Sequence, residues 1–362
     1  MAFSAADHGH MTRALRLAAR GLFSTSPNPR VGCVIVRNTT VVGEGWHEKA
    51  GAPHAEPLAL HAAGNAARDA TVYVTLEPCS HVGRTPPCAD ALIDAGVARV
   101  VVAMTDPNPL VSGAGLARLR TAGIDVSTGL LETEARELNL GFISRMTRGR
   151  PWVRLKVAAS LDGKTALNNG KSQWITGPAA RRDAHAWRAR SCAMLTGIGT
   201  VKDDDPQLTV REVDTPRQPL RVVVDSHLET PPGARILKDG AVLIATAENP
   251  PARLRPLEAR GAEVVVLPDA NGRVDLSVLM AELGRRGINE VMVEAGSRLN
   301  GALLQANCVD ELLIYQAPVL LGERARGMFD LAELASLGDR RELVIRDRRM
   351  LGADQRIIAR FS

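Results

Sequence analysis

One histidine and two cysteines are the residues of this chain best suited to bind a metal ion together. His54 lies two residues before Glu56, and Cys79 and Cys88 follow downstream. One imidazole and two thiolates suit Zn²⁺, and three protein ligands leave a fourth tetrahedral position for water. Glu56 remains free to move protons for that water instead of binding the metal. The pattern predicts one catalytic zinc ion per chain, with Glu56 as the catalytic residue.

The spacing of these residues is close to the zinc-deaminase signature, H-x-E followed by P-C-x-x-C. Pro78 precedes Cys79, but eight residues instead of two separate the cysteines. A structural zinc knuckle is the main alternative, and it would normally show a fourth Cys or His ligand. His81, between the two cysteines, is the only candidate for that fourth ligand.

Secondary structure predicted around the ligands would bring them together. Residues 71–76 form an apolar run typical of a buried strand, and Cys79 follows its end. One predicted helix begins at Cys88 and another directly after His54. Because helix N-termini carry partial positive charge, they would favour the anionic thiolates and the hydroxide that zinc makes available.

Length and composition indicate a two-domain protein of the cytoplasm. The chain has 362 residues, 45% of them hydrophobic, enough for two cores. Its five cysteines are scattered, which fits a reducing compartment better than a disulfide framework. We find no apolar run of about 18 residues and no secretory apolar core at the N-terminus, where residues 11–22 predict a core helix instead.

The charge and the aromatic content bear on the class of ligand. A formal net charge of +5 would favour phosphorylated ligands. Aromatic residues make up only 3% of the chain, which leaves few platforms for stacking the bases of single-stranded nucleic acid. We therefore expect a small phosphorylated substrate, with no nucleic acid and no membrane partner.

Strands alternate with helices in both halves of the chain, which predicts two layered α/β domains. We expect residues 130–146 to form the closing helix of the first domain, residues 1–147. The basic segment that ends in Gly149-Arg150-Pro151 marks a boundary, and residues 150–362 form the second domain. Residues 342–346 and 356–361 are expected to close it as an antiparallel pair.

Several polar residues in loops are candidates for ligand contacts. Asn28 lies in a stiff Pro-Asn-Pro loop and offers both a donor and an acceptor to a pyrimidine edge, although it also suits an ordinary turn. His47 is either a contact near the metal or a loop histidine. Between the zinc cysteines, His81 and Arg84 suit a phosphate or a heterocycle, and a solvated loop is the alternative.

Two glycine patterns fail as dinucleotide fingerprints. Lys202 follows Gly197 and Gly199, and Arg118 follows Gly113 and Gly115, where G-x-G-x-x-G requires a last glycine. Residues 294–297, between a strand and a helix, could instead form an anion-binding helix N-terminus.

Motifs distributed over the whole chain resemble those of the bifunctional riboflavin-biosynthesis deaminase–reductase family. They are PNPRVGC (27–33), GEGWHEKAGAPHAE (43–56), TLEPCSHVGRTPPC (75–88), KVAASLDGKTA (156–166), SQWIT (172–176), DDDPQLTVR (203–211), VVVDS (222–226) and VEAGSRLNGALL (293–304). The resemblance implies an N-terminal cytidine-deaminase-like α/β/α domain, with that family's long spacer between its zinc cysteines, followed by a dihydrofolate-reductase-like α/β domain.

The resemblance also implies two consecutive reactions. The first is zinc-dependent hydrolysis of the C2 amino group of 2,5-diamino-6-(5-phosphoribosylamino)pyrimidin-4-one, which gives 5-amino-6-(5-phosphoribosylamino)uracil. The second is NADPH reduction of the ribosyl group to a ribityl chain. Pro57-Leu58 departs from the Val-His that relatives often carry, which concerns the fit of the substrate more than zinc binding.

Residue by residue, the family match assigns three further sets of contacts. The deaminase substrate contacts are Asn28, His47, His81 and Arg84. The NADPH contacts are Ala158, Trp174, Thr200, Asp204, Ser226, Gly296, Ser297, Arg298, Leu299, Asn300, Gly301 and Ala302. The reductase substrate contacts are Ser172, Arg188, Leu208, Arg211 and Glu294. Asp162 either shapes the site or caps a turn, and the sequence names no proton donor for the reduction.

One rival hypothesis keeps the zinc site and changes the rest. In it the chain is a zinc deaminase of nucleic acid or free nucleobases, and its C-terminal half is a non-catalytic nucleotide-sensing or oligomerisation module. The family match favours the two-step enzyme, located in the cytoplasm and assembled as a homo-oligomer, either a dimer or a tetramer.

Overall fold

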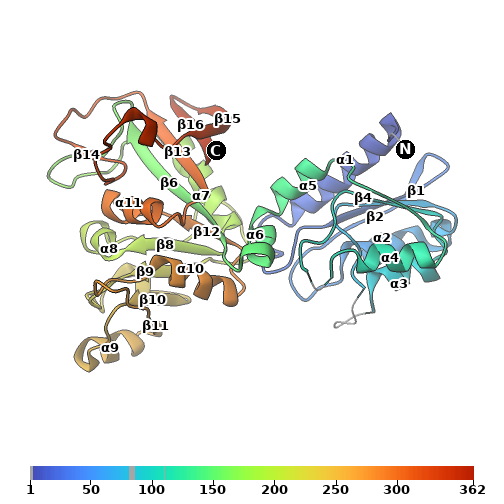
Figure 1. The fold of residues 1–362 in the computed structure, drawn as a ribbon, viewed down its shortest axis with the longest axis horizontal. Helices are drawn as coiled ribbons and strands as arrows, with labels where there is room; N and C mark the ends of the chain where they lie inside the picture. Colours follow the sequence, from blue (N-terminus) through green and yellow to red (C-terminus); the bar gives the residue numbers. More distant parts are fainter. Residues whose placement is uncertain (1–2, 81–85, 110) are drawn as a thin grey trace. The chain divides into compact units, whose positions relative to one another are not determined.

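The computed structural model of the chain describes residues 3–80, 86–109 and 111–362 (Figure 1). They form two compact units, Met1–Gly149 and Arg150–Ser362. The predicted contacts His81 and Arg84 lie outside the described residues. None of the described helices is both long and apolar enough to cross a membrane.

The N-terminal unit is built around a five-stranded mixed sheet. Its described elements follow in the order α1 (Ala5–Arg20), β1 (Gly32–Arg37), β2 (Thr40–Trp46), α2 (Ala55–Ala63), η1 (Gly64–Ala67), β3 (Thr71–Val74), α3 (Cys88–Asp94), β4 (Arg99–Val102), α4 (Ala114–Thr121), β5 (Asp125–Thr128), α5 (Glu132–Leu138) and α6 (Leu140–Arg148). The strand order is β2-β1-β3-β4-β5. Strand β1 is antiparallel to both neighbours, whereas β3, β4 and β5 are parallel.

Helix α2, which follows His54, packs very closely on β2 because β2 contains two glycines. A Cβ atom on Gly45 would lie 2.4 Å from the backbone oxygen of Ala55, and one on Gly43 would lie 2.2 Å from that of Ala59. Only a residue without a side chain fits against backbone at that distance. The two glycines therefore set the depth at which the first turn of α2 lies on the sheet.

The predicted closing helix is interrupted in the structure. Asn139 separates α5 from α6, and its side-chain amide pairs with the backbone of Arg30: Oδ1 accepts from the Arg30 N–H at 2.8 Å and Nδ2 donates to the Arg30 carbonyl at 3.0 Å. Because Asn139 is buried, this pair satisfies backbone groups that would otherwise lack partners. A tertiary contact across 109 positions thus breaks a helix that its apolar pattern alone would continue.

The C-terminal unit contains a nine-stranded sheet. Its described elements are β6 (Trp152–Ser160), β7 (Lys164–Ala166), α7 (Pro178–Arg190), β8 (Ala193–Gly197), α8 (Ile198–Asp204), β9 (Leu220–Val224), η2 (Arg235–Leu237), β10 (Val242–Thr246), α9 (Pro251–Glu258), β11 (Ala262–Val266), α10 (Leu276–Arg285), β12 (Glu290–Val293), α11 (Ser297–Gln305), β13 (Glu311–Ala317), β14 (Arg326–Gly327), η3 (Leu337–Asp339), β15 (Leu343–Leu351) and β16 (Asp354–Phe361). The strand order is β11-β10-β9-β8-β12-β6-β13-β16-β15.

Seven strands of this sheet, from β11 to β13, are parallel, and β16 and β15 extend it antiparallel as predicted. Helices cover both faces of the parallel part, and neighbouring residues of β8 show this alternation. Leu195 packs with the apolar residues of α10 and α11, whereas Met194 packs with those of α7 and α9. The carboxyl ends of the parallel strands meet at one edge, where ligands of open α/β sheets usually bind.

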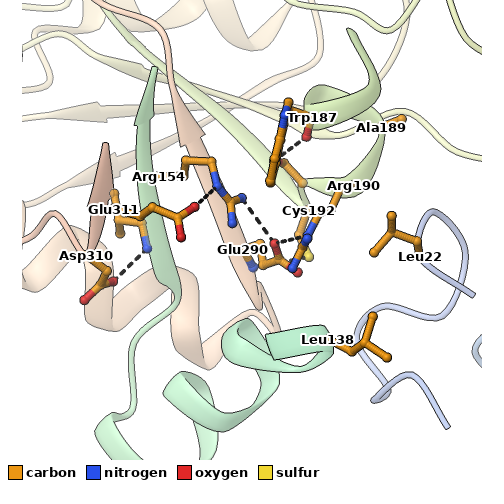
Figure 2. A network of polar contacts seen from close by, with 12 residues as sticks. Leu22, Leu138, Arg154, Trp187, Ala189, Arg190, Cys192, Glu290, Asp310 and Glu311 are labelled. Carbon is orange, nitrogen blue, oxygen red and sulfur yellow. Dashed lines mark hydrogen bonds and ion pairs between the residues drawn. The ribbon is translucent and has the colours of Figure 1, made fainter. Parts of the chain in front are cut away.

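A buried ionic network fixes α7 to this sheet (Figure 2). Arg154 of β6 lies between Glu290 of β12 and Glu311 of β13 and forms an ion pair with each. Arg190, the last residue of α7, also binds Glu290, at 2.8 Å, and the guanidinium of Arg154 lies 4.3 Å from the ring centroid of Trp187. These contacts hold the last turn of α7, and Arg188 is part of that turn.

Candidate active sites

The three predicted metal ligands converge in the N-terminal unit. The Nδ1 atom of His54 lies 3.3 Å from Sγ of Cys88 and 3.7 Å from Sγ of Cys79. In a tetrahedral zinc site, ordinary bond lengths separate a nitrogen and a sulfur ligand by about 3.6 Å. Among the described residues, this is the group whose ligand atoms all lie within 4.8 Å of one another. Donor types and spacing therefore both fit Zn²⁺.

Local structure places each of the three ligands. His54 is the N-cap of α2 and Cys88 is the first residue of α3, so two helix N-termini lie at the site. A hydrogen bond from Cys88 lowers the pKa of Cys79, and the same contact raises the pKa of Cys88. Cys79 therefore loses its proton more readily than Cys88, and metal binding would require both thiols to be deprotonated.

Glu56 is buried in the first turn of α2, with only 3% of its surface exposed. Burial raises its pKa to about 7, and the charge of nearby His54 opposes that rise. A carboxyl group with a pKa near 7 can both accept and release a proton at neutral pH. Glu56 therefore has the position and the acidity of a general acid–base residue beside the three ligands.

Asn28 and His47 form a hydrogen-bonded pair next to the ligands. Nε2 of His47 lies 3.0 Å from the side-chain nitrogen of Asn28, and its Nδ1 lies 3.0 Å from the Pro53 carbonyl. Since that carbonyl can only accept, Nδ1 carries the proton and Nε2 accepts from Asn28. Burial lowers the pKa of His47, which keeps this ring neutral, and its centroid is 5.5 Å from that of His54.

In the C-terminal unit, two of the predicted substrate contacts form a buried ion pair. The guanidinium of Arg188, on α7, binds Glu294 through two hydrogen bonds of 2.6 and 2.9 Å. Glu294 follows β12 at the carboxyl edge of the sheet, and Nζ of Lys156, on β6, lies 3.6 Å from its Oε2 atom. Burial alone would raise the pKa of Glu294, but the charges of Arg188 and Lys156 outweigh it and hold that pKa well below its usual value.

The segment that carries Leu208 and Arg211 runs beside this pair. Arg188 also donates to the backbone oxygen of Thr209, at 3.1 Å. The backbone N–H of Arg211 donates to Nδ1 of His185 at 3.2 Å, and the Arg211 side chain binds the Thr209 hydroxyl at 2.9 Å. Two arginines therefore lie close to one carboxylate, an arrangement that leaves positive charge for an anionic substrate.

The predicted cofactor residues gather at the carboxyl ends of β8 and β12. Gly197 and Gly296 are the N-caps of α8 and α11, and neither helix has a side-chain cap. A Cβ atom on Gly296 would lie 4.0 Å from the hydroxyl of Thr200, so the two N-termini face a common region. Uncapped N–H groups at helix N-termini suit the phosphates of a dinucleotide.

The remaining predicted contacts lie at the same end of the sheet or in loops beyond it. Ser226 follows β9, and its hydroxyl accepts from the Val274 N–H at 3.2 Å. Ser172 lies 3.4 Å from Asp204 in an open pocket of about 470 Å³. Ala158 lies on β6, and the exposed ring of Trp174 stacks with Arg181, at 4.7 Å.

Two residues of this site were missed by the sequence prediction. Lys156 contacts Glu294, and it lies inside the matched stretch KVAASLDGKTA, which was the available signal. His185 accepts from Arg211, and it lies on α7 one turn before Arg188, but a lone histidine in a helix carries no signal of that kind. Asp162, left open between two roles, ties loops together by accepting from Ser160, Leu321 and Gly322.

Comparison with known proteins matches each unit to a different family profile. Residues 4–104 match the cytidine and deoxycytidylate deaminase zinc-binding region, and residues 151–354 match the RibD C-terminal domain. Together with the His54–Cys79–Cys88 group, these matches define the class of the protein: a zinc-dependent deaminase joined in one chain to a reductase.

Relatives that match the whole chain narrow this class. The riboflavin biosynthesis protein RibD of Escherichia coli is 51% identical over 96% of this chain and 97% of its own length, and that of Haemophilus influenzae is 48% identical over 93% and 92%. The structure of Acinetobacter baumannii RibD has a TM-score of 0.92 at 44% identity, with 99% of both chains covered. The chain belongs to the RibD family.

A solved structure from Thermotoga maritima, described as a diaminohydroxyphosphoribosylaminopyrimidine deaminase/5-amino-6-(5-phosphoribosylamino)uracil reductase, is 33% identical, with a TM-score of 0.87 over 99% of both chains. The chain is therefore a bifunctional deaminase and reductase of riboflavin biosynthesis, with Zn²⁺ and NADPH as cofactors. The rival hypothesis of a non-catalytic C-terminal module is wrong, because residues 151–354 match the RibD C-terminal domain.

Proposed function

We propose that the chain first deaminates 2,5-diamino-6-(5-phosphoribosylamino)pyrimidin-4-one at C2 and then reduces the ribosyl group of the product to a ribityl chain. One observation carries the deaminase half: a buried carboxyl group, Glu56, with a pKa of about 7 beside a His54–Cys79–Cys88 set spaced for zinc. The reductase half is supported by the Arg188–Glu294 pair at the sheet edge, near two uncapped helix N-termini.

In the deaminase half, His54, Cys79 and Cys88 hold the metal. When bound, Zn²⁺ supplies a Lewis acid that lowers the pKa of water to about 7. Glu56 accepts one proton from water and delivers it to the ring nitrogen. It then takes the second proton, from the hydroxyl group added at C2, and delivers it to the leaving amine, so that ammonia departs and a carbonyl group remains at C2. Asn28 and His47 orient the heterocycle, with the amide of Asn28 fixed by its bond to Nε2 of His47. His81 and Arg84 complete the proposed contacts to base and phosphate.

In the reductase half, the residues at the carboxyl edge of the sheet bind both ligands. When bound, NADPH supplies the reducing equivalents, and the protein aligns it with the opened ribosyl carbon. Residues 296–302, with Ala158, Trp174, Thr200, Asp204 and Ser226, hold the cofactor. Ser172, Leu208 and Glu294 contact the substrate, and Arg188 and Arg211 supply charge for its phosphate.

The order of the two steps is tested by product identification with and without NADPH. Without NADPH, mass spectrometry should show the deaminated ribosyl compound together with one equivalent of ammonia. With NADPH, the ribityl uracil compound should replace it. Accumulation of a ribityl diaminopyrimidine, which still carries the C2 amine, would contradict the proposed order.

We assign residues 1–147 to the deaminase and residues 150–362 to the reductase. The boundary between the two compact units, which lies between Gly149 and Arg150, supports this assignment. The small phosphorylated pyrimidine is the partner of both, and we propose no nucleic-acid partner. We place the enzyme in the cytoplasm because two of its zinc ligands, Cys79 and Cys88, are thiolates that must stay reduced. In accord with this, the five cysteines are free in the structure.

We further propose that the chain forms a homo-oligomer through β15 and the segment before it. Every residue from 331 to 350 is exposed except Asp347, so β15 has no covering layer on either face. Its apolar side chains Leu343, Val344 and Ile345 are each more than 40% exposed. A strand needs apolar cover on at least one face, which a second copy of the chain can supply.

Charge supports a second copy as the occupant of this surface. Three arginines of β15, at positions 346, 348 and 349, form no ion pair among the described residues. The preceding segment offers Asp330 and Glu333, which are likewise exposed and without an ion pair there. The acidic segment of one copy can therefore face the basic strand of another, in either a dimer or a tetramer.

A further inference from the structure

Glu77 is a buried acidic residue that the proposed chemistry does not use. It lies between β3 and Cys79, and only 3% of its surface is exposed. Its carboxylate accepts four backbone N–H groups: Oε2 accepts from Asp106 and Gly113, both at 3.0 Å, and Oε1 accepts from Gly115 at 2.9 Å and Leu116 at 3.3 Å. Two donors on each oxygen leave no exposed lone pair for a ligand, so Glu77 binds protein and not substrate.

The donors belong to the turn after β4 and to the first turn of α4. Helix α4 begins at Ala114 with Gly113 as its N-cap and has no other side-chain cap, so Glu77 supplies the acceptors for its first N–H groups. The helix also touches the chain next to Glu77. A Cβ atom on Gly115 would lie 2.0 Å from the backbone oxygen of Pro78, so the helix backbone lies directly against the residue before Cys79.

Cys79 is held equally closely from its other side. The N–H of Ala89 donates to the Cys79 carbonyl at 3.1 Å, and the N–H of Cys88 donates to its Sγ at 3.3 Å. Two helix N-termini, those of α3 and α4, therefore fix the short segment that carries Cys79. The contact with α3 comes from a neighbouring ligand, whereas the contact with α4 depends on Glu77.

We infer that Glu77 is a positioning residue for the metal centre: it binds the N-terminus of α4 and so places Cys79 where its sulfur meets His54 and Cys88. The inference rests on the proposed role of Cys79 as a zinc ligand. Groups that orient a metal ligand from behind typically change metal affinity 10- to 100-fold when they are altered. Substitution of Glu77 is therefore expected to lower the zinc affinity while the fold is retained.

The test substitutes Glu77→Gln in the full chain. Glutamine keeps one acceptor oxygen, but its NH₂ group would face two N–H donors, so the helix turn must move away and Cys79 with it. We expect zinc affinity, measured by competition with a chromophoric chelator, to fall by at least about tenfold. The thiolate absorption of the cobalt-substituted protein should change as well. Glu132→Gln, at the N-terminus of α5, is the matched control and should change neither reading.

Folding of the substituted unit is checked by its own thermal unfolding transition, and reductase activity on the deaminated substrate shows that the other unit is intact. Wild-type zinc affinity and cobalt spectrum in Glu77→Gln, with only a lower melting temperature, would overturn the inference and make Glu77 purely structural. The variant Cys79→Ser distinguishes an error about Glu77 from an error about the zinc site itself. If Cys79 is not a zinc ligand, Cys79→Ser binds zinc with wild-type affinity. If Cys79 is a ligand, Cys79→Ser loses affinity whatever the result for Glu77→Gln.

A measurement on the wild-type chain covers the case in which Glu77→Gln does not fold. Coupling between two sites is reciprocal. If the contact between Glu77 and the N-terminus of α4 stabilises the zinc site, removal of zinc should in turn weaken that contact. We expect amide hydrogen exchange at Gly115 and Leu116 to become at least about tenfold faster in the metal-free protein. Unchanged protection of both amides, with faster exchange near His54, would overturn the inference.

Discussion

At the scale of single residues, the two sites use buried charge in opposite ways. Glu56 is buried, and its pKa rises to about 7 although the charge of nearby His54 opposes the rise, which suits a residue that must carry a proton. Glu294 is buried with Arg188 and Lys156 around it, and its pKa falls, which suits a fixed negative charge. The same side-chain type is thus a proton carrier in one unit and a fixed anion at the substrate site in the other.

Breaking the Arg188–Glu294 pair should cost both stability and substrate binding. In Arg188→Met, Glu294 keeps only Lys156 as a partner, and loss of one member of a buried pair costs about 3–5 kcal/mol. We expect a smaller free energy of unfolding of the C-terminal unit by denaturant titration, and a higher KM in the reduction. Arg182→Met, at an exposed position of the same helix, is the control. Equal effects of both variants would contradict the role of the pair.

The lowered pKa of Glu294 also fixes the direction of a pH effect. Unfolded, this carboxyl group titrates near a pKa of about 4.3, whereas the folded protein releases its proton more readily. Its contribution to stability is therefore present above that pH and lost as the pH falls through the folded pKa. The difference in unfolding free energy between wild type and Glu294→Gln should be large at pH 6 and shrink below about pH 4. A constant difference would contradict the assignment.

At the scale of elements, close packing of helices on strands positions the metal site. Gly45→Ala tests this, because the new Cβ atom would lie 2.4 Å from the Ala55 backbone oxygen and push the first turn of α2 away. We expect a loss of about 1–3 kcal/mol in the free energy of unfolding, together with weaker zinc binding. Gly9→Ala, in α1, meets no atom within 4 Å and should be neutral or stabilising. Unchanged zinc affinity in Gly45→Ala would show that α2 is not held there.

The parts of the fold that depend on local pattern could be predicted from the sequence. An apolar run identified the strand at residues 71–76, strand–helix alternation identified both layered α/β units, and residue type with spacing identified His54, Cys79 and Cys88. Contacts between distant segments could not be predicted. The break at Asn139 depends on the backbone of Arg30, and the four donors to Glu77 come from residues 29 to 39 positions away. Apart from residues 294–297, which lie at a predicted strand–helix junction, the contacts of the reductase site came from the family resemblance, because no local pattern marks them.

At the scale of the whole molecule, two catalytic units share one chain, and one surface of the second unit lacks cover. Each unit has its own core and its own sheet. The proposed consequence of the exposed β15 is self-association of the chain. Because β15 lies at the edge of the nine-stranded sheet, association there would leave the carboxyl ends of the parallel strands free for ligands.

Self-association is tested by Ile345→Asp, which places a carboxylate among the exposed apolar residues of β15. Analytical ultracentrifugation should show an oligomer for the wild type and a smaller species for the variant. Val266→Asp makes the same change on β11, the opposite edge of the sheet, and should not alter the mass. A monomeric wild type would contradict self-association through β15.

The most direct test of the central claim is Glu56→Gln, assayed for zinc content and for both reactions. The variant should retain nearly one zinc per chain, release no ammonia from the diaminopyrimidine and oxidise no NADPH with it, yet oxidise NADPH at the wild-type rate when given the deaminated compound. Ammonia release at the wild-type rate from the zinc-loaded variant would contradict the assignment of Glu56 as the proton carrier.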